Sequence, residues 1–252
     1  MKKITWLPIV FLLFFANGSL FSQDSGNNHL FHFGLKVSPA LSWFTPSDKK
    51  FTDNGVKFGF GYGLVTEFGF TKNYAFSTGL EILNAGGKIG FPKSPDSTFY
   101  TVLNTDVTPN RTDTFLLQQR TYMLRYVNVP LLLKLKTNQI GAMTYFGQFG
   151  FDVSFKWQAT SNDDVSLKGT ASTRNDVDIS KDINFIRLAL NVGLGAEYNL
   201  AGSTSLVFAL NYNNGFTNTL KNGSKMLFDK KFTALTQKAV FNYVALTVGV
   251  LF

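Results

Sequence analysis

The chain contains no cysteine, only two histidines and few charged residues. The lack of cysteine excludes disulfides, thiolate metal sites, a cysteine nucleophile and a lipid-modified N-terminal cysteine. Charged residues make up 16% of the sequence, whereas ordinary globular domains contain roughly 25%. The formal net charge of +8 is spread along the chain without a basic helix or a dense basic stripe. We therefore do not expect nucleic acid as a partner.

Long hydrophobic runs are also scarce, and only one segment, at the N-terminus, could form an apolar helix. Lys2 and Lys3 precede the apolar residues 7–15, and small or polar residues follow. This pattern predicts a secretory signal peptide over residues 1–23, followed by a short periplasmic segment over residues 24–29. A membrane anchor would need about 20 apolar residues. Since no later segment is of that kind, a mature protein in a membrane must cross it as a β-barrel.

Phenylalanine and glycine are abundant, with 27 and 22 residues, and they follow a period of two. Residues 142–157 and 183–200 alternate large apolar with small or polar side chains, and in residues 56–70 glycines alternate with large aromatic residues. These runs are longer than the about 5–6 residues usual for strands of soluble domains. Glycines on the other face from large aromatics suit the crowded inside of a narrow barrel. The pattern favours one face toward lipid and one toward a lumen.

We predict an all-β fold, a single antiparallel transmembrane up-and-down β-barrel of eight strands over residues 30–252. The strand-like runs lie at residues 30–44, 56–71, 74–91, 120–137, 142–159, 183–200, 204–216 and 239–252. Short and long connections alternate, as in outer-membrane barrels, which puts both termini in the periplasm. The terminal Phe252 on an alternating strand resembles the C-terminal signal of bacterial outer-membrane proteins. Ten strands stay open as an alternative, because residues 92–119 are long for a structureless loop.

Two residues interrupt the pattern of the run at 120–137. Pro130 cannot donate a ladder hydrogen bond, so a bulge or a local bend is expected there. Arg125 is in phase with the apolar face, which indicates that the membrane band ends below it.

The chain resembles the PorT-type outer-membrane β-barrel proteins of Bacteroidetes over nearly the whole mature part. The segments that carry the resemblance are FHFGLKVSPALSWF (31–44), GYGL (61–64), FSTGLEI (76–82), YVNVPLLLKLK (126–136), NVGLGAEY (191–198) and FALNYNNGFTN (208–218). The resemblance implies an outer-membrane barrel of a functionally mixed family, whose namesake is implicated in type IX secretion. It therefore implies an accessory role in protein secretion, with other outer-membrane or periplasmic secretion proteins as partners.

Seven charged residues fall on the predicted inward face. They are Lys36, Glu67, Glu81, Lys134, Asp152, Arg187 and Glu197. Because an unpaired buried charge is costly, we expect them to pair in a polar plug that closes the interior. The alternative is a charged constriction in a narrow, porin-like channel for small solutes. An eight-stranded barrel, however, is only wide enough inside for side chains.

Catalysis is not expected, because the histidines offer no suitable general base. His32 alternates inward at the periplasmic start of the first strand, far from the outer loops, and His29 precedes that strand. The sequence has no Ser-His-Asp order, phosphate loop or metal-ligand cluster. No cofactor or metal is therefore expected.

Two long connections carry opposite charges. Segment 217–238 contains Lys221, Lys225, Lys230, Lys231 and Lys238, and segment 160–182 contains Asp163, Asp164, Asp176, Asp178 and Asp182. The first four lysines could face lipopolysaccharide phosphates, since lysine binds phosphate as a point charge. The acidic segment could bind a divalent cation. Alternatively, the basic segment is simply solvated, or the two segments pack together. We predict a non-enzymatic structural or docking component of the outer membrane, in contact with its lipid and lipopolysaccharide.

Overall fold

The computed structural model describes residues 31–49, 51–91, 100–102, 116–167, 170–221, 224–228, 231–235 and 238–252. Within these ranges the regular elements are all strands. No helix of the described residues is long and apolar enough to cross a membrane. The predicted signal peptide and the segment at 24–29 lie outside the described residues.

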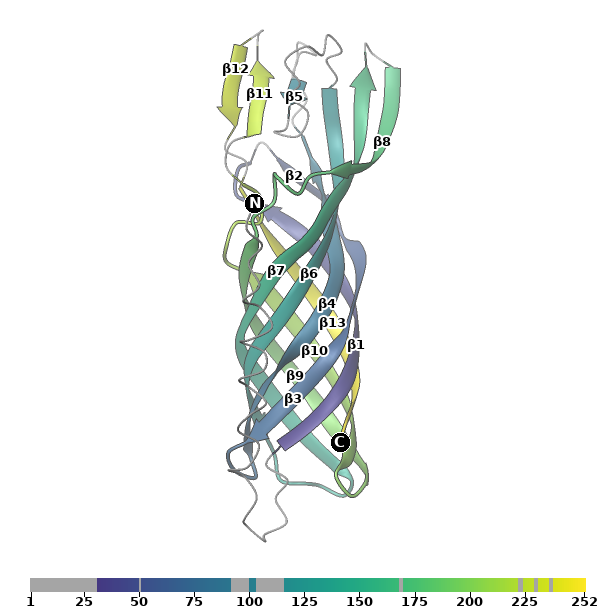
Figure 1. Ribbon diagram of the computed structural model, residues 1–252, viewed down its shortest axis with the longest axis vertical. Helices are drawn as coiled ribbons and strands as arrows, with labels where there is room; N and C mark the ends of the chain where they lie inside the picture. Colours follow the sequence, from purple (N-terminus) through teal and green to yellow (C-terminus); the bar gives the residue numbers. More distant parts are fainter. Residues whose placement is uncertain are drawn as a thin grey trace, which may run out of the picture.

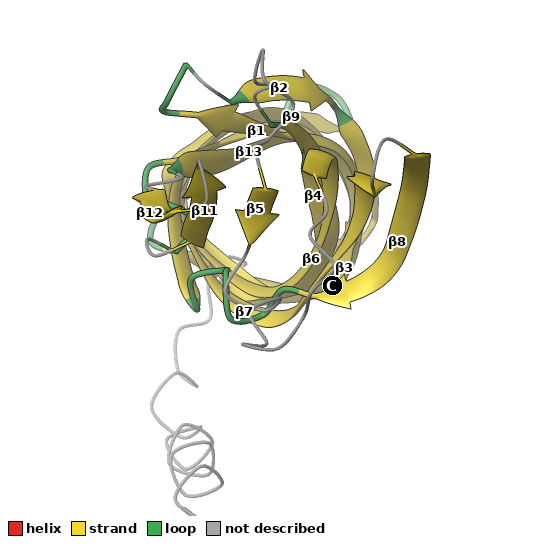
Figure 2. Cartoon of the chain, turned by 90° about the horizontal axis from the view of Figure 1, so that it is seen from above, coloured by secondary structure: helices red, strands yellow, loops and turns green. Residues whose placement is uncertain are grey.

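Eight antiparallel strands close into a barrel, visible from the side in Figure 1 and along its axis in Figure 2. They are β1 (Phe31–Pro46), β3 (Lys57–Gly69), β4 (Tyr74–Gly90), β6 (Leu116–Lys136), β7 (Met143–Leu167), β9 (Ile186–Ala201), β10 (Thr204–Gly215) and β13 (Ala239–Leu251). Each strand pairs with its neighbour along the chain, and β1 pairs with β13 to close the ring. The predicted eight-stranded up-and-down barrel is confirmed, and the ten-stranded alternative is wrong.

The two ends of the barrel differ. Short turns join the strands at one end, which we call the turn end, and Phe252 also lies there (Figure 1). At the other, the loop end, five further strands extend the structure. They are β2 (Thr52–Gly55), β5 (Tyr100–Val102), β8 (Thr170–Asp178), β11 (Ser224–Phe228) and β12 (Lys231–Leu235). β2 pairs with β4 and β8 pairs with β7, while β5, β11 and β12 form a separate sheet beyond the barrel.

These extensions correct the predicted loops. β6 begins at Leu116 and pairs with β7 as far as Ser166, so both strands run beyond the predicted limits of 120 and 159. The predicted loop at 160–182 is therefore the end of β7 and all of β8. The predicted loop at 217–238 contains β11 and β12. Polar strands outside lipid lack the apolar outer face that marked the other strands, and the sequence pattern missed them for that reason.

The outer wall of the barrel is apolar, because alternate side chains of every barrel strand point away from the lumen. Leu35 is 60% exposed and Leu194 is 71% exposed. Exposed tyrosines near the turn end and exposed aromatic residues near the loop end border this band. Those near the turn end are Tyr74, Tyr145 and Tyr198. Those near the loop end are Phe58, Trp157, Phe185 and Tyr212. A wall of this kind is stable only against lipid, and aromatic girdles are typical of membrane barrels.

The irregularities in β6 differ from those expected. The register of β6 with β7 passes Pro130 without a shift. It shifts between Leu117 and Gln119 and between Arg125 and Tyr126, and at the second place β7 contributes Trp157 as an extra residue. On the other side, the pairing of β4 with β6 omits Gly79, which faces Pro130 in the register. Arg125 points outward, as its phase predicted, and its Nε donates to Asn84 Oδ1 at 2.7 Å.

Candidate functional site: the filled lumen

The structure places all seven predicted inward charges inside the barrel. Lys36 is half-buried and the other six are buried. Five of the seven take part in ion pairs, whereas Asp152 and Arg187 are joined through a neutral residue. The polar groups occupy successive levels from the turn end to the middle of the barrel, and an apolar cluster fills the lumen near the loop end.

Four charges form a quartet at the turn end of the lumen. Lys134 contacts Glu67 and lies 2.5 Å from Glu197, and Lys136 lies 2.8 Å from Glu67 and 2.9 Å from Glu197. Two cations and two anions thus balance each other. The Lys134 ammonium also lies 3.9 Å from the centre of the Phe146 ring, where a cation–π contact contributes. Glu67, Lys134 and Glu197 are buried and Lys136 is half-buried, so water screens these ion pairs less than it would screen pairs on the surface.

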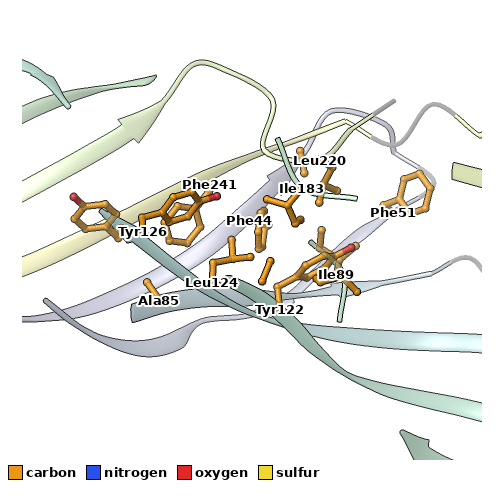
Figure 3. Close-up of a cluster of buried hydrophobic side chains, with 14 of the residues drawn as sticks. Phe44, Phe51, Ala85, Ile89, Tyr122, Leu124, Tyr126, Ile183, Leu220 and Phe241 are labelled. Carbon is orange, nitrogen blue, oxygen red and sulfur yellow. The ribbon is translucent and has the colours of Figure 1, made fainter. Parts of the chain in front are cut away.

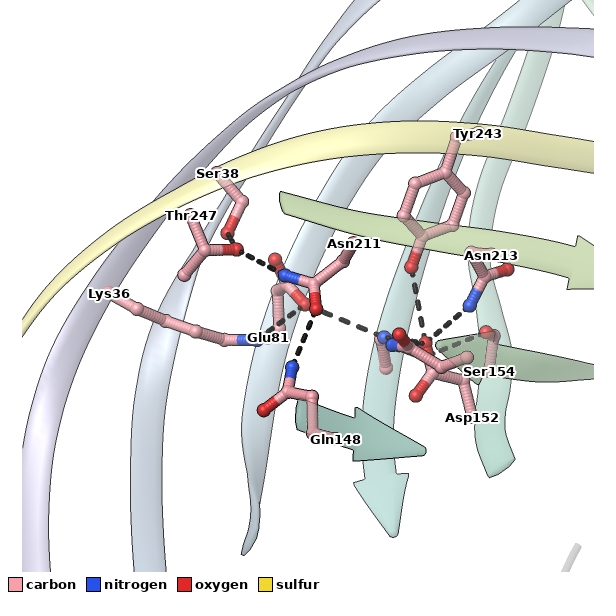
Figure 4. Close-up of polar contacts among 12 residues, drawn as sticks. Lys36, Ser38, Glu81, Gln148, Asp152, Ser154, Asn211, Asn213, Tyr243 and Thr247 are labelled. Carbon is pink, nitrogen blue, oxygen red and sulfur yellow. Dashed lines mark hydrogen bonds and ion pairs between the residues drawn. The ribbon is translucent and has the colours of Figure 1, made fainter. Parts of the chain in front are cut away.

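The middle of the lumen is closed by a network of amides and hydroxyls around one ion pair (Figure 4). Lys36 Nζ donates to Glu81 at 2.9 Å. Asn128 lies within 3.5 Å of both Glu81 and Asp152. Asn211 accepts from Gln148 at 2.6 Å and donates to Thr247 at 3.0 Å. Strands from opposite sides of the barrel are tied together in this way.

Asn213 connects Asp152 with Arg187. Its amide nitrogen donates to Asp152 Oδ2 at 2.5 Å, while its amide oxygen accepts from Arg187. Asp152 Oδ2 also accepts from the amide nitrogens of Asn128 and Asn191 and from the Tyr243 hydroxyl. Arg187 also donates to the Phe241 carbonyl at 2.7 Å, and its guanidinium carbon lies 4.9 Å from the centre of that ring. Both charges have mainly neutral partners, and the other carboxylate oxygen of Asp152, Oδ1, is buried without a hydrogen-bond partner among the described residues.

An apolar cluster fills the lumen near the loop end (Figure 3). Phe44 is its centre, with ring centroids 5.0 Å from Tyr122 and 5.5 Å from Phe241. Ile183 and Leu220 follow β8 and β10 and form a bridge with each other, which covers the cluster. Sequence reasoning missed this plug because it took the whole lumen to be polar.

A buried ion pair lies beside the apolar cluster. Arg120 Nε and Nη2 bind the two carboxylate oxygens of Asp163 at 2.6 and 2.5 Å, and Asp182 lies 3.9 Å from Arg120 Nη1. Two of the acids predicted to lie in a loop, Asp163 and Asp182, thus lie beside Arg120 of β6, and the backbone carbonyl of Asp182 also accepts from Lys221 of segment 217–238. On β8, hydrogen bonds from the hydroxyl and the backbone N–H of Ser180 hold the pKa of Asp178 below its usual value, so this exposed carboxylate stays charged.

A family model covers most of the chain. The model of the outer membrane protein beta-barrel domain family matches residues 21–221. The chain belongs to this family. Family membership and the lipid-facing wall both place the protein in a bacterial outer membrane.

No curated protein matches the outer-membrane barrel described here. Among solved structures it is similar to Neisserial surface protein A, with 14% identity and a TM-score of 0.39 over 87% of this chain and 95% of that one. OprG from Pseudomonas aeruginosa has 10% identity and a TM-score of 0.42 over 88% and 95%. AlkL has 11% identity and a TM-score of 0.45 over 92% and 93%. The family model, and not these individual neighbours, identifies the chain.

A vestibule of about 420 Å³ opens at the turn end of the outer-membrane barrel. Glu67, Glu197 and Lys136 of the quartet line it, together with His32 and hydroxyl and amide side chains of the turns. His32 is half-buried and pairs with Glu67 in the register of β1 with β3. Within the described residues, no group of three or more histidines and carboxylates could hold a metal ion.

Three of the predicted lipopolysaccharide-facing lysines, Lys221, Lys225 and Lys231, lie at the loop end. Lys221 is exposed, and its backbone N–H donates to Asp182 at 2.8 Å. Lys225 and Lys231 lie in β11 and β12, and the structure describes their backbone only. Lys230 lies outside the described residues.

Sequence reasoning missed several polar members of the lumen, and three of them show why. Lys136 follows Lys134 by two residues, so the alternation itself could have identified it. Arg120 could not be assigned a partner, because Asp163 had been assigned to a loop. Asn213 is uncharged, and only the closed barrel shows that it joins Asp152 to Arg187.

Proposed function

We propose that the protein is a non-catalytic outer-membrane barrel that acts as a structural or docking component. The filled lumen is the observation that supports this role most directly. The charge quartet, the amide network and the apolar plug occupy successive levels of the interior. Inside the wall, a cavity of only about 60 Å³ lies between the quartet and the network, which is room for a few water molecules. A barrel with this interior acts through its ends and its outer wall.

The loop end offers a surface for docking. β8 pairs with β7 along one edge, and its other edge has no strand partner in the described part of the chain. Such an edge presents N–H and C=O groups that can pair with a strand of another protein. With the resemblance to PorT-type proteins, this edge supports an accessory role in type IX secretion. In that role both termini face the periplasm, and the partners are other outer-membrane or periplasmic secretion proteins.

Cross-linking in native outer membranes tests the docking role. We expect an epitope-tagged copy to recover components of a secretion system, identified by mass spectrometry, because the ends of a filled barrel are its functional surfaces. A tagged abundant porin, expressed at the same level, is the control for nonspecific recovery. Recovery of lipopolysaccharide and porins alone would contradict the docking role.

A narrow channel for small solutes is the second candidate function. The turn-end vestibule and the inner cavity favour it, because only the quartet separates these two spaces. Glu67, a member of the quartet, lines both of them. Between that cavity and the loop end lie the amide network and the apolar cluster.

Conductance in planar bilayers separates the two functions. We expect the wild-type barrel to give no reproducible unitary steps, since ions would have to cross an apolar plug. Heat-denatured protein is the control for leakage through damaged bilayers. Reproducible steps from folded wild-type protein would favour the channel and contradict a closed lumen.

A further inference from the structure

A groove of about 370 Å³ lies on the barrel wall near the loop end. Phe58 and Phe60 of β3 form one side, and Met123 and Arg125 of β6 with Gln158 of β7 form the other. β4 runs beneath it. The groove is separate from the lumenal network, and the docking role proposed above does not involve it.

Local backbone features explain why the wall is hollow here. The pairing of β3 with β4 ends at Phe60 and Asn84. Beyond that point Ala85 of β4 is buried in the apolar cluster of the lumen, and the next residue, Gly86, has no side chain to fill the gap. On the far side, the bulge at Trp157 leaves both that residue and Gln158 exposed, whereas alternation would expose only one of them.

The groove has cations and no matching anions. Lys57 lines it, and its Cδ is 3.2 Å from the position that a Cβ on Gly86 would take, so the side chain lies close over that glycine. Lys88 is near enough to repel the Lys57 ammonium electrostatically. Among the described residues, none of the ion pairs includes Lys57, Lys88 or Arg125.

Arg125 is held in a defined position at the groove. Its Nε donates to Asn84 Oδ1 at 2.7 Å. That bond uses one of the five N–H donors of the guanidinium, and its two terminal nitrogens keep donors for a ligand. Arginine pairs with phosphate through two parallel hydrogen bonds, and lysine adds a point charge.

The surroundings restrict the ligand to a lipid. Phe58 is 67% exposed and Trp157 is 63% exposed, and both belong to the aromatic girdle near the loop end. Such girdles lie at the level of the lipid headgroups. A ligand at this level meets cations and an apolar surface together, so an anionic headgroup that carries acyl chains fits both.

We propose that this groove is a binding site for a phosphate-bearing lipid A of the outer leaflet. Its phosphate binds Arg125 and Lys57, and an acyl chain lies along Phe58 and Phe60. The site differs from the basic segment 217–238, because it lies on the barrel wall and holds apolar as well as charged groups.

Native mass spectrometry of the refolded full chain in detergent tests the site, with bisphosphorylated lipid A as the probe. We expect wild type to retain one lipid A. The double variant Lys57→Gln/Arg125→Gln should bind at least about tenfold more weakly, which corresponds to the loss of one charged hydrogen bond. The matched control is Lys49→Gln/Lys181→Gln, which removes the same charge from two exposed lysines near the loop end that lie outside both the groove and the basic segment 217–238. Its affinity should equal that of wild type.

Heat modifiability on gels checks that both variants are folded before they are compared. Dephosphorylated lipid A should bind wild type as weakly as the phosphorylated probe binds the groove variant. The proposal is overturned if the control variant loses as much affinity as the groove variant. It is also overturned if the phosphorylated and dephosphorylated probes bind equally, or if wild type retains no lipid A.

Discussion

Replacing Lys134 by methionine is expected to lower the free energy of unfolding of the barrel by about 3–5 kcal/mol. Lys134 is 1% exposed and contacts both Glu67 and Glu197. Without it, two buried carboxylates share the single ammonium of Lys136. The loss comes from the uncompensated negative charge, since methionine keeps most of the buried volume. Urea titration of the folded fraction in detergent measures the change.

A double-mutant cycle shows whether charge balance is the cause. Adding Glu197→Gln to Lys134→Met leaves Lys136 with Glu67 as a balanced pair, so the double variant should be more stable than Lys134→Met alone. Lys72→Met, on an exposed turn, is the control and should change stability by less than about 0.5 kcal/mol. Additive losses in the cycle would mean that the four charges are not coupled.

The barrel could be predicted because every strand that crosses lipid must alternate apolar side chains toward lipid with side chains toward the lumen. The run predicted at 74–91 is β4 (Tyr74–Gly90), and the run predicted at 204–216 is β10 (Thr204–Gly215). The same alternation puts Asp152 and Arg187 inside, where both are buried. A period of two fixes the face of each side chain, so a correct strand also gives the correct face.

The contacts inside the barrel could not be predicted from alternation. Alternation shows which face of a strand a side chain lies on, but not which residue it contacts. Arg120 and Asp163 are 43 positions apart in sequence, and they meet only because β6 and β7 pair beyond the membrane band. The apolar plug depends on Ile183 and Leu220, which fold over the mouth from outside the barrel strands. Tertiary closure, and not a local pattern, determines these contacts.

Gly79 is a position where one added methyl group should be severely destabilising. Its φ is +155°, and a Cβ built there would lie 2.1 Å from the Leu64 carbonyl oxygen on β3. Neither that backbone atom nor the strand can move cheaply, because β3 is paired on both sides. The residue also faces Pro130, where the ladder of β4 with β6 is interrupted. A strained backbone and a clash thus coincide in the wall.

We expect Gly79→Ala to lower the free energy of unfolding by about 3 kcal/mol or more. Gly147→Ala is the matched control, because a Cβ at Gly147 has as its nearest atom Leu194 Cδ2, at an ordinary 3.7 Å. Alanine in a strand loses less backbone entropy on folding than glycine, so the control should be as stable as wild type or slightly more stable. Heat modifiability and urea titration measure both variants. Equal stability of the two would show that β3 shifts to accept the methyl group, and the close approach of β3 and β4 at Gly79 would then not be a requirement of the fold.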